Sequence, residues 1–184
     1  MLFRSHDALA KLERQGKLKT VITQNIDNLH QKAGSQNVYE LHGHLREVTC
    51  LQCYQVQDSA RILEKFVRDA KVPKHHCGGV LKPNVIFFGE LLPEQAYAAS
   101  VAALQQADVV MIVGSSMEVA PASELPQVAL ERGARLIIVN YSATPWDARA
   151  DVIVRADVAA ALPDRKSTRL NSSHSQQSRM PSSA

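Results

Sequence analysis

The 184-residue sequence has no long hydrophobic run, and no stretch approaches the 18 or more apolar residues of a membrane-spanning helix. Its opening stretch, MLFRSHDALAKLERQG, has no apolar block followed by the small residues of a signal-peptide cleavage site. We therefore expect a cytoplasmic chain with no membrane partner. The composition, 45% hydrophobic and 21% charged, is typical of one globular domain with a sizeable core.

Cysteine is scarce, because the chain carries only Cys50, Cys53 and Cys77. Three cysteines argue against a disulfide framework in a cytoplasmic chain. Cys50 and Cys53 form a CxxC pair, a spacing that fits either a redox couple or two metal ligands.

Acidic residues are missing from the C-terminal stretch 165–184, which carries four basic residues and many serines. Without those four, the chain has 17 basic and 18 acidic residues. The net charge of +3 therefore does not indicate a nucleic-acid-binding surface. We interpret 164–184 as a disordered segment that resembles read-through into a cloning adaptor, and exclude it from the fold. A disordered native terminus is the alternative.

Hydrophobic periodicity and breakers predict alternating helices and strands along the rest of the chain. Buried-type apolar runs such as VVMIV and LIIV indicate parallel strands. We expect an α/β fold, a partial Rossmann-like parallel sheet with helices on both faces, plus a small zinc-ribbon insertion. Helices are predicted over 5–15, 27–34 with Gly34 as its C-cap, 59–70, 95–107 and 123–133, and strands over 19–23, 37–41, 84–88, 108–114, 134–140 and 151–154.

Small or polar residues follow two of these predicted strands. Gly114, Ser115 and Ser116 come after VVMIV, and Asn140 comes after LIIV. Parallel sheets bind ligands at the carboxyl ends of their strands, where backbone amides suit phosphate and a side-chain amide suits ribose. The pattern favours a nucleotide site, although each feature alone is also an ordinary turn.

The metal-ligand pattern consists of the CxxC pair and Cys77, which 23 residues separate from Cys53. This spacing is slightly longer than that of a zinc ribbon. Lys74 stands where a second CxxC would begin, and its protonated amine is a poor zinc ligand. His75 can complete a Cys3His tetrahedron, whereas His76 is adjacent to Cys77 and fits less well. We expect structural Zn2+ on Cys50, Cys53, His75 and Cys77; the alternative is a site that holds no metal.

Six segments occur in a characteristic order: TQNIDNLHQKAG, ELHGH, CLQC, CGGVLKPNVIFFGE, VGSSMEVAPA and LIIVN. Together, from about His6 to Pro163, they closely resemble the sirtuins, the NAD-dependent protein lysine deacylases. The resemblance implies transfer of the acyl group of an acyl-lysine protein or peptide to ADP-ribose, with release of nicotinamide. NAD is then the cofactor, zinc is structural, and no direct nucleic-acid partner is expected.

The resemblance also implies roles for individual residues. His42 matches the general base, and Asn25 and Asp27 are expected to assist catalysis by favouring positive charge on the ribose. His30 and His44 are interpreted as structural or supporting, and Glu90 and Glu118 as orienting peptide or loop. The NAD-binding positions are Gln24, Asn25, Ile26, Asp27, Gly114, Ser115, Asn140 and Val158, and the acyl-peptide positions are Val85, Phe87, Phe88 and Gly89.

The sequence departs from the sirtuin pattern because it contains no Gly-Ala-Gly or GxGxxG loop. Such a loop cradles the pyrophosphate of NAD. We expect residues 1–163 to be a sirtuin-type catalytic domain that lacks its first Rossmann unit, with a zinc-binding insertion at about 46–83. Such a chain is expected to expose sheet edges and to bind NAD poorly.

Three alternatives to deacylation remain open at this point. They are a non-catalytic zinc-bearing remnant, an NAD-dependent mono-ADP-ribosyltransferase and, least favoured, a thiol-redox protein acting through CxxC.

Overall fold

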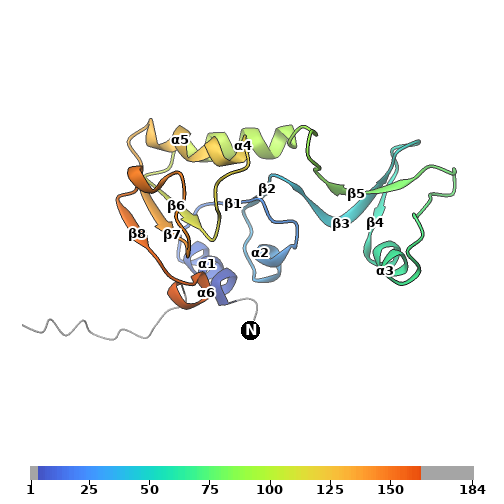
Figure 1. Ribbon diagram of the computed structural model, residues 1–184, viewed down its shortest axis with the longest axis horizontal. Helices are drawn as coiled ribbons and strands as arrows, with labels where there is room; N and C mark the ends of the chain where they lie inside the picture. Colours follow the sequence, from blue (N-terminus) through green and yellow to red (C-terminus); the bar gives the residue numbers. More distant parts are fainter. Residues whose placement is uncertain (1–3, 163–184) are drawn as a thin grey trace, which may run out of the picture.

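The computed structural model describes residues 4–162, so the predicted tail 164–184 lies outside the described residues. Parallel strands and their helices form one part of the molecule, and a small antiparallel sheet with its own helix forms the other (Figure 1). Within 4–162, no helix is both long and apolar enough to cross a bilayer. The α/β class and the separate small insertion are confirmed.

The strands of the larger part are parallel, as predicted, but they form two sheets. β1 (Val21–Thr23) pairs with β2 (Val38–Glu40), while β7 (Arg135–Val139) lies between β6 (Val109–Val113) and β8 (Val152–Val154). The prediction of a fully buried 108–114 strand is wrong, because Val109 is 50% exposed. Within the described residues β6 pairs only with β7, so its other edge is uncovered.

Helices cover both sides of these strands (Figure 1). α4 (Glu94–Leu104) packs with α5 (Leu125–Leu130) on one side, and α1 (Arg4–Arg14) contacts α6 (Val158–Ala161) on the other. Pro126 lies in the first turn of α5, where its missing N–H costs nothing. The main core contains Leu41, Leu104, Ala122, Leu125, Ala129 and Ala134, and a second cluster contains Ile112, Leu136 and Ile138.

The small sheet has the order β4-β3-β5, formed by β3 (Gly43–Cys50), β4 (Val56–Asp58) and β5 (Leu81–Val85). α3 (Ala60–Asp69) lies beside it, and Val48, Cys50 and Leu81 make its core. The predicted strand 84–88 is wrong in its bounds, since β5 spans 81–85. Pro83 cannot donate to a ladder, and β5 accommodates it as an edge strand.

The short helix α2 (Leu29–Lys32) is only the middle of the predicted 27–34 segment. The predicted start at Asp27 is one residue too early, because the N-cap is Asn28, although Asp27 accepts a hydrogen bond from the backbone N–H of Leu29 at 2.9 Å. The predicted C-cap position is wrong: the C-cap is Ala33, and Gly34 follows with a φ of 98°. Two 3-10 turns, Ala122–Glu124 and Asp147–Arg149, complete the described elements.

Candidate functional site

His42 lies where β1 and β2 end, and the structure places it against the segment that follows β1. The backbone N–H of Leu41 donates to the carbonyl of Thr23 at 2.9 Å. One residue later, Nδ1 of His42 lies 3.1 Å from the carbonyl oxygen of Gln24. A carbonyl only accepts, so Nδ1 carries a proton, and in the neutral ring the lone pair is on Nε2. The hydrogen bond to Gln24 thus fixes the orientation of the His42 ring.

The Gln24–Asp27 loop is held by two local hydrogen bonds. The N–H of Asn25 donates to Oγ1 of Thr23 at 3.1 Å, and Asp27 accepts from the N–H of Leu29 as described above. Gln24 and Ile26 are partly buried, whereas Asn25 and Asp27 are exposed. Two of the four side chains are therefore exposed to solvent beside His42, where they can meet a ligand.

The predicted nucleotide-binding residues gather at the carboxyl ends of β6 and β7. The N–H of Gly114 donates to Val139 at 3.0 Å, which places Gly114 beside Asn140. A Cβ at Gly114 would lie 3.3 Å from Val158 at the start of α6. Ser115 Oγ accepts from the N–H of Met117, and Asn140 is buried. The structure thus brings together all four residues that the sequence predicted for this edge: Gly114, Ser115, Asn140 and Val158.

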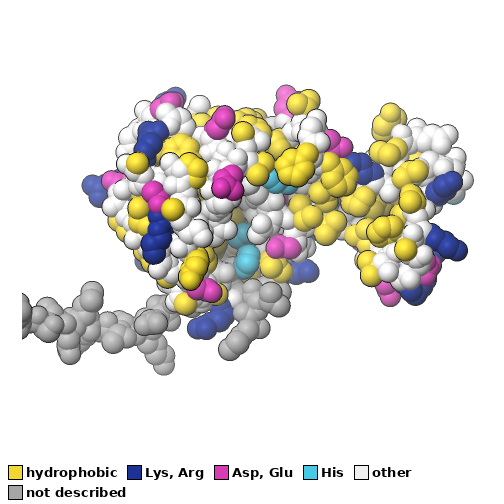
Figure 2. Space-filling view, in the orientation of Figure 1, with side chains coloured by type: hydrophobic (Ala, Val, Ile, Leu, Met, Phe, Trp, Pro, Cys, Tyr) yellow, Lys and Arg dark blue, Asp and Glu magenta, His cyan; other side chains and the backbone are white. Residues whose placement is uncertain are grey.

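The predicted acyl-peptide segment follows β5 and touches the strand that carries His42. The N–H of Ile86 donates to the carbonyl of His42 at 3.0 Å, a contact that sequence reasoning missed. Phe87 is 54% exposed and Phe88 is 96% exposed. Figure 2 shows hydrophobic side chains exposed over the stretch between β5 and α4, which includes both phenylalanines. Gly89 has a φ of 87°, which favours glycine there.

Glu90, which the sequence-based interpretation treats as an orienting residue, forms hydrogen bonds with this segment. Its Oε2 accepts from the N–H of Phe87 and from Nζ of Lys82, both at 2.9 Å. These two donors lower the pKa of Glu90. A carboxylate that is already bound and ionised is suited to fixing the loop and not to acid catalysis.

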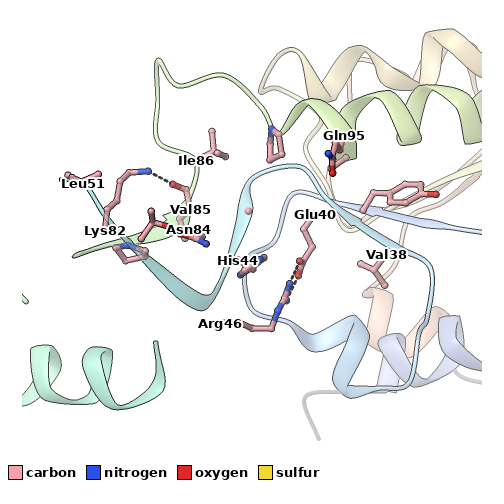
Figure 3. A pocket seen from close by; sticks show the side chains of 16 residues that line it. Val38, Glu40, His44, Arg46, Leu51, Lys82, Asn84, Val85, Ile86 and Gln95 are labelled. Atoms are coloured by element: carbon pink, nitrogen blue, oxygen red, sulfur yellow. Dashed lines mark hydrogen bonds and ion pairs between the residues drawn. The ribbon is translucent and has the colours of Figure 1, made fainter. Parts of the chain in front are cut away.

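A cavity of about 610 Å³ lies between the small sheet and the first turn of α4 (Figure 3). Val85 and Ile86 line it, together with Gly43, His44 and Gln95. Its lining does not include His42, Phe87 or Phe88. Of the predicted substrate positions, only Val85 therefore contributes to this cavity, and the aromatic pair lies outside it.

Cys50, Cys53, His75 and Cys77 converge on one point, with their ligand atoms all within 4.8 Å of one another. Nδ1 of His75 lies 3.3 Å from Sγ of Cys53 and 3.1 Å from Sγ of Cys77, and the sulfurs of Cys50 and Cys77 are 3.5 Å apart. Tetrahedral zinc separates such ligands by about 3.5–3.8 Å. The residues therefore fit zinc after a small outward shift.

The environment of the cluster also suits a metal. Backbone N–H groups of Cys53 and Gln52 aimed at its sulfur lower the pKa of Cys50 to about 7, which favours the thiolate that binds metal. His75 is buried, whereas His76 is exposed and packs against it with ring centroids 3.8 Å apart and an interplanar angle of 48°. The sequence-based choice of His75 over His76 agrees with this geometry.

Because His30 in α2 is buried, we expect the free energy of unfolding to depend on pH. Burial, and then the neighbouring His6, lower the pKa of His30 below 6.5, and Asp27 and Glu40 offset this only in part. Because the folded state disfavours the protonated ring, stability is complete above 6.5 and is lost as the pH falls toward the folded-state pKa. We expect the urea midpoint to fall between about pH 7.5 and 5.5, and to fall less in His30→Gln. Equal decreases in both proteins would contradict this assignment.

Comparisons with known proteins are consistent with this geometry. The Sir2 family model matches residues 2–121. A protein of Sulfurisphaera tokodaii named NAD-dependent protein deacetylase is 45% identical over 160 residues, which cover 87% of this chain and 63% of that protein. The chain thus spans less than two thirds of that relative.

Solved structures of Sir2 proteins are also similar to this chain. A Sir2 structure with a p53 peptide and NAD+ superposes with a TM-score of 0.81 at 39% identity, covering 85% of this chain and 65% of that one. Sir2Tm bound to a propionylated peptide has the same TM-score and identity, with coverage of 85% and 66%. On these matches of sequence and structure, the chain belongs to the Sir2 family.

Proposed function

We propose that this chain carries the acyl-transfer machinery of an NAD-dependent protein lysine deacetylase or deacylase. The observation that carries the proposal is the placement of His42, with a free Nε2, beside the Gln24–Asp27 loop. The S. tokodaii relative is named a deacetylase, and a Sir2 protein of the same fold was solved with NAD+ and a peptide. Because the chain covers about 63% of that relative, the activity of the whole protein is part of the proposal.

NAD would supply a ribose carbon that exchanges nicotinamide for the acyl oxygen, and ribose hydroxyls that receive the acyl group, while one water molecule would be consumed as the lysine amine leaves the acyl carbon. Gln24, Asn25, Ile26 and Asp27 would surround the nicotinamide end. The exposed carboxylate of Asp27 would favour positive charge on the ribose. His42 would take a proton from a ribose hydroxyl at Nε2, and Gln24 would stabilise the ring through Nδ1.

The adenosine end would lie at the β6–β7 edge, on Gly114, Ser115, Asn140 and Val158. A positive φ of 58° at Gly114 leaves its backbone open to a close approach by ligand. The acyl-lysine peptide would lie along Val85, Phe87, Phe88 and Gly89. Exposed aromatic surface there can exclude water from the lysine stem once the peptide is bound.

Zinc on Cys50, Cys53, His75 and Cys77 would be structural, because four protein ligands leave no open position for substrate. The residues that we assign to the zinc-binding insertion, about 46–83, fall within the small sheet and its helix. Cysteines must be reduced to bind zinc, and the three cysteines form no disulfide, which supports a reducing, cytoplasmic location.

The identity of the fourth ligand gives a prediction about zinc affinity. His75→Ala should weaken zinc binding by at least about tenfold, because even residues one step removed from a metal contribute 10–100-fold. His76→Ala is the matched control and should bind normally, since His76 is exposed. Competition with a chromophoric chelator measures both affinities. Loss of zinc in His76→Ala alone would show that the wrong histidine was assigned.

Nicotinamide release tests whether the machinery turns over. The test protein is the S. tokodaii relative with its 160 matching residues replaced by those of this chain, assayed beside the 184-residue chain itself. We expect the chimera to release nicotinamide from NAD only when an acetyl-lysine peptide is present. A folded chimera with bound zinc and no release would instead indicate a non-catalytic zinc-bearing module.

A further inference from the structure

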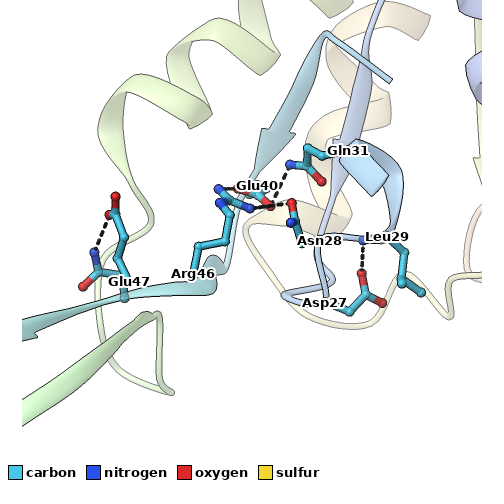
Figure 4. Close-up of polar contacts among 8 residues, drawn as sticks. Asp27, Asn28, Leu29, Gln31, Glu40, Arg46 and Glu47 are labelled. Carbon is cyan, nitrogen blue, oxygen red and sulfur yellow. Dashed lines mark hydrogen bonds and ion pairs between the residues drawn. The ribbon is translucent and has the colours of Figure 1, made fainter. Parts of the chain in front are cut away.

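A compact polar network joins three segments that lie before and after His42 in the sequence (Figure 4). Arg46 on β3 donates two hydrogen bonds to the carboxylate of Glu40, from Nη1 to Oε1 at 2.7 Å and from Nη2 to Oε2 at 2.5 Å. The same Nη1 donates to Oδ1 of Asn28 at 2.8 Å. Gln31 of α2 donates to Oε1 of Glu40 at 2.8 Å. One ion pair thus links β2, β3 and the start of α2.

In the sequence, residues of this network lie on both sides of the candidate base, His42. Glu40 ends β2 two residues before His42, and Arg46 follows it after Gly43 has turned the chain into the small sheet. Asn28 directly follows Asp27 and has a left-handed backbone, with φ 62° and ψ 21°. A non-glycine residue keeps that conformation when its surroundings hold it. The guanidinium of Arg46 is one such restraint.

The geometry distinguishes this pair from an ordinary surface salt bridge. The side chain of Glu40 is only 10% exposed, and that of Arg46 is 39% exposed. Burial opposes ionisation of Glu40, but hydrogen bonds from Arg46 and Gln31 more than offset it and lower its pKa. A bidentate guanidinium–carboxylate pair fixes orientation as well as distance. Lysine cannot reproduce that fork.

We propose that Arg46 and Glu40 are positioning residues that hold the Gln24–Asp27 loop in register with His42, through Asn28 and α2. Neither residue reaches the reacting atoms; they act through the loop. This role rests on the proposed deacylase function for its kinetic consequence, but its structural consequence can be measured without any turnover.

Amide hydrogen exchange in the 184-residue chain tests the structural consequence. The probes are the N–H groups of Asn25 and Leu29, which hold the loop. Glu40→Gln keeps the shape and removes the charge, and Arg46→Lys keeps the charge and removes the fork. We expect both probes to exchange at least about tenfold faster in each variant, with β7 amides unchanged.

Arg68→Lys is the matched control, because Arg68 pairs with Asp69 on α3, outside this network. It should leave the Asn25 and Leu29 amides as they are. If either main variant fails to fold, Asn28→Gly replaces it: glycine tolerates the left-handed backbone and removes only the acceptor for Arg46. Unchanged exchange at both probes in folded variants overturns the proposal.

Kinetics in the chimera then test the catalytic consequence. We expect Arg46→Lys to lower kcat for nicotinamide release about tenfold, with the KM for peptide within about twofold, because the loop and not the peptide site is loosened. Faster exchange with unchanged kcat would overturn the catalytic role. A chimera that is inactive before any substitution refutes the proposed function instead, and the exchange result still decides the structural claim.

Discussion

Alanine at position 42 is expected to lower the rate of acyl transfer by at least about 100-fold, the range that a positioned general base contributes. The hydrogen bond from Nδ1 to the carbonyl of Gln24 leaves Nε2 as the base, and no other side chain is held by Gln24 in this way among the described residues. His42 is only partly buried, so its replacement should leave the fold intact. Single-turnover assays of the chimera measure the rate.

A second variant of His42 distinguishes its role as a base from its hydrogen bond to Gln24, and a variant of His44 is the control. His42→Asn can still donate to Gln24 but has no basic nitrogen, so it should be as inactive as His42→Ala. His44→Ala is the neighbouring control, because His44 lies on β3 and lines a cavity whose lining does not include His42, and it should keep most of the rate. Full activity in His42→Asn would mean that position 42 serves only to hold the loop.

Replacing Gly43 with alanine is expected to destabilise the protein by roughly 2–5 kcal/mol, the combined range for an unfavourable φ and an overpacked contact. Gly43 has a φ of 72°, and an added Cβ would lie 2.0 Å from the carbonyl oxygen of Asn84. That oxygen belongs to the backbone of β5, so β3 and β5 would have to separate. Peptide binding along Val85 should be lost with this pairing.

Gly16 provides a matched control for the steric part of this effect. It has the same φ of 72°, but an added Cβ would meet nothing within 4 Å. Gly16→Ala should therefore cost only the conformational strain, about 1–2 kcal/mol. Urea unfolding gives both free energies. Equal losses in the two variants would mean that the approach of Asn84 to Gly43 contributes nothing.

The sequence predicted the local elements well where their signals are local. Gly16 ends α1 and Pro126 starts α5, because each restricts its own backbone. It failed for residues 84–88, where two phenylalanines suggested a strand. Sheet pairing is a tertiary property: β5 ends where the N–H of Ile86 turns to His42, and no residue inside 84–88 encodes that partner.

In the candidate site, too, features with local signals were predicted from the sequence, and features that depend on tertiary contacts were not. His75 could be preferred to His76 from spacing alone, because a histidine adjacent to Cys77 fits the ligand geometry less well, and the cluster contains His75. The Glu40–Arg46 pair was missed, although Glu40 begins ELHGH and Arg46 follows two residues after it in the sequence. Two opposite charges six residues apart do not by themselves predict an ion pair. Here the turn at Gly43 brings the two side chains together.

The destination of the acyl group is the measurement that tests the central claim most directly. The chimera is incubated with NAD and a peptide whose lysine carries an isotopically labelled acetyl group, and the products are identified by mass spectrometry. We predict labelled acetyl on ADP-ribose, one nicotinamide per acetyl removed, and a free lysine. ADP-ribose attached to protein, with the label still on lysine, would contradict the account and identify an ADP-ribosyltransferase.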